Sequence, residues 1–264
     1  MSKNEKEQVK IEEIAIKRIK SVFETENHKC WFGLNQSDAD ALKRTFENVY
    51  QNTEANNFPD FLFDNGYIEH FVVTSSKESK KGAQHKIEKS KFDNRSKEII
   101  EKLPQINGKV TNRFDYPEHS YGYFRNSFKK NFEKHIRSLR AYFGSKDHGI
   151  FLVEYKDIGA LEMFELSLEE VGSVFMGDIK IRQEKLDCYR LSRDKSMLNW
   201  LHEYKEELEY IIFSTRENIE IIKIDSIPKI LSLLPFDYAI VDTFSPTMFE
   251  HFIPLISNMD SDSN

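Results

Sequence analysis

The sequence predicts an α/β (α+β) fold in which a mixed central β-sheet is flanked by helices. Three observations support this class: an N-terminal segment with apolar residues at helical spacing, two β-rich runs around a tight-turn signal, and later β-rich runs that alternate with amphipathic segments. No internal repeat and no Pro/Gly-rich linker is visible in the 264 residues. We therefore expect one domain over residues 1–264, with a core at about 5–160 and a C-terminal α/β extension at 161–264.

Two helices are expected before the first hairpin. Apolar residues recur near helical spacing over about residues 5–25, which predicts the first helix. Ser37 followed by Asp40 resembles a capping box, and the apolar stripe behind it predicts a second helix over 37–53.

The clearest hairpin signal lies between the runs FPDFLF and YIEHFVVTSS. The Asn65-Gly66 pair between them favours the positive φ angles of a tight primed turn. Pairing about this turn places Asp60 almost opposite Glu69 and His70. The segment that follows, KESKKGAQHKIEKSKF, is so charged that we expect an exposed loop leading into a helix, or partial disorder.

The second half alternates helices and strands. Apolar residues from Phe124 to Phe143 step by three or four, which predicts a strongly amphipathic helix beginning near Ser127. The run GIFLVEYKD indicates a buried strand. The later expected elements are a helix opened by Ser192 and Asp194, strands in EYIIFST and NIEIIKI, a short helix near 227–234, and a strand in DYAIVDTF.

Composition favours a folded protein of the reducing cytoplasm. The hydrophobic share is 39% and the charged share is 31%, which is far from the signature of disorder. Two cysteines, Cys30 and Cys188, cannot form a disulfide framework. No run approaches the roughly 20 apolar residues of a membrane helix, and we expect no export signal. A net charge of −6 excludes chain-wide attraction to nucleic acid or to anionic lipid.

The hairpin carries the best functional signal. If Asp60 and Glu69 face each other, their carboxylates lie within reach of one ion, and a hard divalent cation such as Mg²⁺ (or Mn²⁺) is the usual reason to tolerate such repulsion. That cation polarises a phosphoryl oxygen and lowers the pKa of a bound water. The alternative is that Asp60 is an ordinary polar residue near the turn and that Glu69 points to solvent.

Pro59-Asp60, the hairpin and then Glu69 resemble the core of the PD-(D/E)XK, or restriction-endonuclease-like, nuclease superfamily. The resemblance implies a nuclease-like domain with a helix, hairpin, helix, strand order over about residues 5–160, and Mg²⁺ bound by both acids. In that superfamily a lysine two residues after the second acid supports the attacking water. This chain has Phe71 there, so a migrated lysine is expected among three residues just beyond the strand: Lys77, Lys80 and Lys81.

Other acids are further expected site residues. The resemblance implies that Glu13 on the first helix is a candidate for an additional metal ligand, although a solvent-facing Glu on a highly charged helix is the simpler explanation. Glu154 and Lys156 share a strand face as a literal E-x-K and form a rival catalytic set. The alternative is an ordinary exposed pair on an edge strand.

Basic residues cluster on the aromatic helix, where they could contact phosphates beside aromatic side chains. The expected nucleic-acid contacts are Arg125, Lys129, Lys130, Lys134 and Arg137. A solvated helix face is the simpler reading of the same residues.

The chain has neither G-x-x-x-x-G-K-[ST] nor G-x-G-x-x-G, so nothing supports nucleotide binding by a glycine-rich loop. The histidines form no compact ligand motif, and we expect most of them at the surface. Ser192 opens a helix whose N–H groups could bind phosphate, although capping by Ser192 explains it more simply.

The runs NGYIEHFVVTSS, LSRDKSMLNW and IEIIKIDSIP are similar to uncharacterised bacterial and phage-associated proteins. Together the observations favour a cytoplasmic metal-dependent endonuclease that hydrolyses DNA, or RNA, in restriction or antiviral defence. One alternative is a non-catalytic nucleic-acid- or protein-binding module with a degenerate nuclease-like fold, which Phe71 favours. Another is a homo-oligomer or a partner of a defence protein, which would associate through the aromatic helix face.

Overall fold

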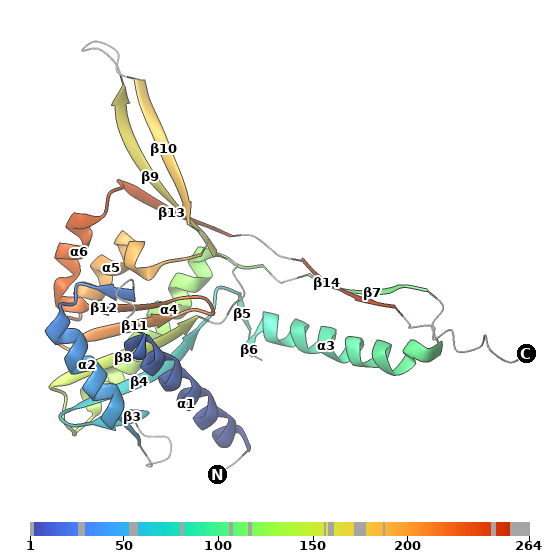
Figure 1. Ribbon diagram of the computed structural model, residues 1–264, viewed down its shortest axis with the longest axis horizontal. Coiled ribbons are helices and arrows are strands. Elements are labelled where there is room, and N and C mark those ends of the chain that lie inside the picture. The colour runs from blue at the N-terminus through green and yellow to red at the C-terminus, as the bar shows by residue number, and fades with distance from the viewer. Residues whose placement is uncertain are drawn as a thin grey trace, which may run out of the picture.

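A computed structural model describes residues 3–25, 30–52, 58–79, 82–105, 108–115, 118–155, 157, 161–171, 178–186, 188–243 and 247–253. Within these residues a seven-stranded mixed sheet forms the body, in the order β1-β12-β11-β8-β4-β3-β2 (Figure 1). Its strands are β1 (Trp31–Phe32), β2 (Tyr50–Gln51), β3 (Phe61–Phe63), β4 (Gly66–Val73), β8 (His148–Tyr155), β11 (Tyr210–Ser214) and β12 (Ile219–Lys223). The expected mixed sheet flanked by helices is confirmed.

Strands β4, β8 and β11 run parallel at the centre of the sheet, and β3 returns antiparallel to β4. A parallel neighbour requires a crossover, and α4 (Tyr121–Ala141) lies between β4 and β8 in the chain. β11 and β12 extend the same sheet on the other side of β8.

Each face of the sheet carries its own helices (Figure 1). The α1 face is the side that packs against α1 (Lys3–Glu24) and α2 (Gln36–Asn48), and it includes Ile68 of β4 and Leu152 of β8. The α4 face is the opposite side, which packs against α4, α5 (Lys195–His202) and α6 (Ile227–Leu233). Side chains alternate along a strand, so neighbouring residues of β4 belong to different faces.

Two smaller sheets extend from the body in Figure 1. One joins β9 (Leu161–Val171), β10 (Asp178–Leu186) and β13 (Tyr238–Thr243). The other pairs β7 (Val110–Asp115) with β14 (Thr247–Phe252) beside α3 (Gln84–Lys102). The short pair β5 (Glu78–Ser79) and β6 (Gly82–Ala83) precedes α3, and 3₁₀ turns cover Leu103–Gln105, Leu191–Arg193 and Ile224–Ser226.

The expected helices exist, but their bounds differ from the prediction: α2 ends at Asn48, before β2, rather than at residue 53, and α2 and α4 begin earlier than predicted. α2 is capped by Asn35 in a capping box with Asp38, so the predicted Ser37–Asp40 box is wrong. α4 begins at Tyr121 because the Ser120 side chain accepts a hydrogen bond from the Tyr123 N–H.

The aromatic stripe of α4 is buried within the chain. Phe124, Phe128 and Phe132 are fully buried, and Phe132 packs edge-on against Phe151 with ring centroids 5.1 Å apart. This face therefore packs into the core of the chain, and of its aromatic residues only Phe143, beyond the helix end, is open to solvent.

Among the helices that the structure describes, none is both long enough and apolar enough to cross a lipid bilayer.

Candidate metal centre

The hairpin brings Asp60 and Glu69 into contact, as the sequence predicts. Asn65 in the turn has a φ of 62°, and the register pairs Phe61 with Ile68. The next step along the register sets Asp60 beside Glu69, whose Oε2 accepts a hydrogen bond of 3.1 Å from the Asp60 N–H. The Asp60 side chain in turn accepts a hydrogen bond of 2.8 Å from the His70 N–H.

The two carboxylates nevertheless take part in different groups. Glu69 lies on the α4 face, where its Oε1 is 2.5 Å from His135 Nδ1. Asp60 instead offers an oxygen to a group with Glu12 and His70, in which the ligand atoms all lie within 4.8 Å of one another. Among the described residues, the group that could hold a metal ion therefore contains Asp60 but not Glu69.

Glu12 reaches this group because of its position on α1. It shares a helix face with Ala15, Ile16 and Ile19, all buried against the sheet, and is itself only 6% exposed. Gln51 Nε2 donates to Glu12 Oε2 at 3.5 Å. The side chain of Glu13, the expected ligand, is exposed and lies outside the group, so the first-helix acid is the preceding residue.

His70 is held by Glu154, the acid of the rival E-x-K. His70 Nε2 lies 2.9 Å from Glu154 Oε2, and both residues are buried. His70 Nδ1 has no hydrogen-bond partner among the described residues. β8 is a central strand, so the reading of Glu154 as part of an exposed edge-strand pair is wrong. Lys156 lies outside the described residues.

The electrostatics at Asp60 favour a bound cation. Burial, with the nearby carboxylates of Glu69 and Glu12, raises the pKa of Asp60 to about 7. A divalent cation would compensate these negative charges and take the place of the proton. The donor set of two carboxylates and one imidazole therefore suits a divalent metal ion.

On the α4 face, by contrast, Glu69 and His135 bind each other beside the aromatic core. Burial raises the pKa of Glu69 to about 8 and lowers that of His135 to about 4, so the pair is neutral at pH 7. The His135 ring stacks on Phe71, with centroids 4.7 Å apart and planes inclined by 9°. Phe71, at the position of the superfamily lysine, thus belongs to the aromatic core.

The expected lysines do not complete the group. Lys77 is exposed just beyond β4, and Lys80 and Lys81 lie outside the described residues. Lys134 on α4 lies close enough for its charge to favour ionisation of Glu69.

The basic residues of α4 are mostly open to solvent. Lys130, Lys134 and Arg137 are exposed, whereas Arg125 and Lys129 are half-buried, with Lys129 Nζ 4.5 Å from the centroid of Trp200. Because α4 and α1 pack on opposite faces, the sheet separates these side chains from Glu12.

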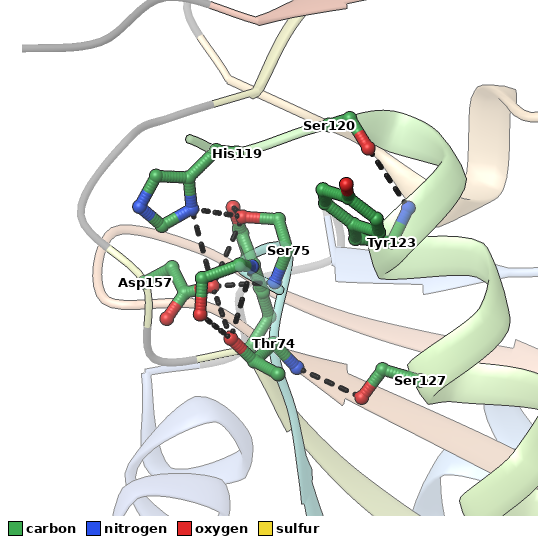
Figure 2. A network of polar contacts seen from close by, with 9 residues as sticks. Thr74, Ser75, His119, Ser120, Tyr123, Ser127 and Asp157 are labelled. Atoms are coloured by element: carbon green, nitrogen blue, oxygen red, sulfur yellow. Dashed lines mark hydrogen bonds and ion pairs between the residues drawn. The ribbon is translucent and has the colours of Figure 1, made fainter. Parts of the chain in front are cut away.

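A second buried polar cluster lies at the carboxyl ends of β4 and β8 (Figure 2). Asp157 Oδ2 accepts hydrogen bonds from Thr74 Oγ1 at 2.7 Å, Ser75 N at 2.5 Å and Ser75 Oγ at 2.9 Å. His119 Nδ1 lies 2.7 Å from Ser75 Oγ and 3.6 Å from Asp157 Oδ2.

This cluster lacks the geometry of a hydrolase triad. In a triad the two nitrogens of the histidine bridge the serine and the acid, whereas here one nitrogen faces both. Ser75 is fully buried, which closes it to substrate. We interpret the cluster as a structural one: its hydrogen bonds connect the end of β4 to the segment before α4.

The N-terminus of α5 is already occupied by a carboxylate. Asp194 accepts a hydrogen bond from the Met197 N–H and another from the Tyr189 hydroxyl. Ser192 is buried and donates to Glu220 Oε1 at 2.6 Å. The expected cap at Ser192 is therefore wrong, and the end of the helix that could attract phosphate carries an acid.

A pocket of about 360 Å³ opens at the amino ends of β4 and β8. It is lined in part by Arg44, Asn65, His148 and Glu209, and it contains none of the proposed metal ligands. His148 Nδ1 and Glu209 Oε2 are 2.7 Å apart at its wall.

The prediction missed Glu12 and His70 as members of this group, although the sequence contains a pattern that points to each of them. Glu12 lies three, four and seven residues before buried apolar positions, a spacing that sets it on the inner face of α1. Two histidines, His70 and His119, are buried, so the expectation that most histidines lie at the surface fails for them. Strand alternation places His70 on the face opposite Glu69, but only the packing of α1 shows which face holds the ligands.

A comparison with protein-family models, curated proteins and solved structures finds no match to this chain.

Proposed function

We propose that this protein is a divalent-metal-dependent hydrolase that cleaves phosphodiester bonds in nucleic acid. The observation that carries the proposal is the convergence of Glu12, Asp60 and His70 to within 4.8 Å, with a buried imidazole nitrogen that has no other partner among the described residues. A buried acceptor without a donor is costly, and ligation of a metal ion would satisfy it.

The order of elements supports the phosphodiester assignment. α1, the β3–β4 hairpin, α4 and the parallel strand β8 follow one another in the order that the nuclease resemblance implies. One acid comes from the first helix and another from the start of the hairpin, at Glu12 and Asp60. We extend this proposal to DNA as the substrate, RNA being the alternative, and to a role in antiviral defence.

Residues of this chain would hold and orient the ligands. Gln51 donates to Glu12, the His70 N–H donates to Asp60, and Glu154 fixes the His70 ring. A bound divalent ion would supply Lewis acidity at the phosphoryl group and favour ionisation of a water. Of the three ligands only Asp60 is partly exposed, so substrate would approach from its side.

The test compares Asp60→Asn with Asp64→Asn in the full chain. Asp64 is an exposed aspartate in the turn of the same hairpin and provides a matched control. We expect cleavage of plasmid DNA, single-stranded DNA or RNA when Mn²⁺ or Mg²⁺ is present, and no cleavage when a chelator is added. Asp60→Asn should reduce the cleavage rate about 100-fold or more, because a metal ligand is removed. Undiminished cleavage by a folded Asp60→Asn variant would refute the proposal.

A second function, a non-catalytic binding module, is favoured by Phe71. Its ring occupies the place of the superfamily lysine and lies in the aromatic core. Such a module would bind nucleic acid, as measured by fluorescence anisotropy, and would leave it intact with every metal tested.

A further inference from the structure

We infer that the Glu12–Asp60–His70 group is selective for divalent metals that accept an imidazole ligand, such as Mn²⁺, over Mg²⁺, and that Glu154 maintains this selectivity by orienting His70. The inference rests on the proposed metal role of the group and specifies the ion.

The two nitrogens of the His70 ring have different surroundings. Nε2 lies 2.9 Å from Glu154 Oε2, and the side chains of His70 and Glu154 are 0% and 7% exposed. A carboxylate at that distance accepts the Nε2–H and so fixes the tautomer in which Nδ1 carries the lone pair. Nδ1 is buried and has no hydrogen-bond partner among the described residues.

The lone pair of His70 Nδ1 is the one that can bind an ion in this group. The ligand atoms of Glu12, Asp60 and His70 all lie within 4.8 Å of one another, and Glu154 occupies Nε2. Nδ1 is therefore the nitrogen left to complete the group. In metal sites of proteins, a carboxylate commonly accepts the N–H of one ring nitrogen while the other nitrogen binds the metal. The carboxylate orients the histidine and raises its basicity.

The chemistry of these three ligands suits some divalent ions better than others. Mg²⁺ prefers oxygen ligands in an octahedron and gives up its water reluctantly, so a buried imidazole contributes little to holding it. First-row transition metals and Zn²⁺ bind imidazole readily, and Mn²⁺ also accepts carboxylates. Two carboxylates with one imidazole therefore favour Mn²⁺-like ions over Mg²⁺.

The experiment titrates the full-length protein with Mn²⁺ and with Mg²⁺ in the absence of nucleic acid. Calorimetry gives both affinities, and the loss of the free Mn²⁺ signal in electron paramagnetic resonance gives the Mn²⁺ affinity independently. We expect Mn²⁺ to bind about tenfold or more tightly than Mg²⁺. Equal affinities would overturn the inference.

Two variants assign the selectivity to its residues. His70→Asn replaces the imidazole with a single amide group and so removes the nitrogen ligand. We therefore expect the Mn²⁺/Mg²⁺ affinity ratio to fall towards one. Glu154→Gln should weaken Mn²⁺ binding by roughly 10- to 100-fold. If Glu154 acts through His70, adding Glu154→Gln to His70→Asn should have little further effect. An unchanged ratio in folded His70→Asn, or a fully additive double variant, would count against the inference.

The neighbouring pair Glu12→Gln and Glu13→Gln is a matched control. We expect Glu12→Gln to weaken both metals and Glu13→Gln, an exposed residue, to weaken neither. Should His70→Asn fail to fold by circular dichroism, the wild-type ratio and Glu154→Gln decide the question. Selective Mn²⁺ binding without cleavage would refute the proposed function alone, whereas cleavage by a protein that binds both ions equally would refute this inference alone.

Discussion

Strand β4 takes part in two carboxylate–histidine pairs, one on each face of the sheet. On the α1 face, His70 lies 2.9 Å from Glu154 and faces two further carboxylates. On the α4 face, Glu69 lies 2.5 Å from His135, whose ring stacks on Phe71. Glu69 and His70 are adjacent in sequence, so a single step along the strand separates the two pairs.

The difference between the pairs lies in what each leaves unsatisfied. Both oxygens of Glu69 have partners, His135 and the Asp60 N–H, so the α4-face pair closes the core. On the α1 face, His70 Nδ1 has none among the described residues. The same pair of residue types thus stabilises the core on one face and, on the other, leaves a nitrogen available to a ligand.

The largest effect should come from placing a lysine at position 71, where the resemblance to the nuclease superfamily led us to look for one. Phe71→Lys places a charge among Phe128, Phe151 and His135, so we expect it to lower the free energy of unfolding by about 3–5 kcal/mol from lost packing alone and to restore no activity.

Val72→Lys is the matched control for this substitution. Val72 is only half-buried and pairs with Glu154 in register, so the substitution should cost about 1 kcal/mol. Urea denaturation of both variants measures the difference, and equal losses would show that the two faces are not distinct.

A smaller effect should appear in the pH dependence of stability with chelator present. The pKa of Asp60 rises from 3.8 in the unfolded chain to about 7, and that of Glu69 rises from 4.5 to about 8. The folded state therefore keeps protons that the unfolded state has released, and stability is lost as pH rises towards these folded values. His135, with its pKa lowered from 6.5 to about 4, acts in the opposite sense, but only below pH 6.5.

We therefore expect the free energy of unfolding to fall between pH 6.5 and 8, by an amount on the order of 1 kcal/mol. Glu69→Gln should flatten this decrease, and adding Mn²⁺ should reduce it because the ion replaces the proton on Asp60. Urea titrations at both pH values measure the effect. A rise in wild-type stability over this range would contradict the assignment of buried, protonated carboxyls.

The smallest effect on stability should come from the exposed cations of α4. Replacing Lys130, Lys134 and Arg137 singly by Ala should change stability by less than about 0.5 kcal/mol. If this helix contacts phosphates, each replacement should weaken nucleic-acid binding and lower the slope of its salt dependence by about one. Anisotropy titrations at several salt concentrations test this, and unchanged slopes would remove α4 from the interface.

Local patterns predicted much of the fold. The tight turn was predicted one residue too late: Asp64 and Asn65 connect the strands, and Gly66 pairs with Phe63 as the first residue of β4. Helical spacing identified α1 and the buried stripe of α4.

The hairpin of β9 and β10 was not foreseen, although apolar residues alternate with polar ones from Phe164 to Leu168 and at Ile179 and Ile181. Charged residues dominate β10, and every residue from Lys180 to Lys185 is exposed, so the strand gave a weak signal.

The group of side chains that could hold a metal ion differs from the expected one by single positions. Asp60 belongs to it, and Glu12 and His70 take part where Glu13 and Glu69 were expected. A superfamily motif names residues by spacing, whereas on a helix or a strand one position decides which side of the element a side chain occupies.

The chain itself determined the alternation of β4, the tight turn, and therefore the contact between Asp60 and Glu69, because these follow from local backbone geometry. Only the tertiary structure decided that His70, rather than Glu69, meets two carboxylates. That outcome depends on which helix covers which face of the sheet, and on Glu12 and Glu154 arriving from segments that are far apart in sequence.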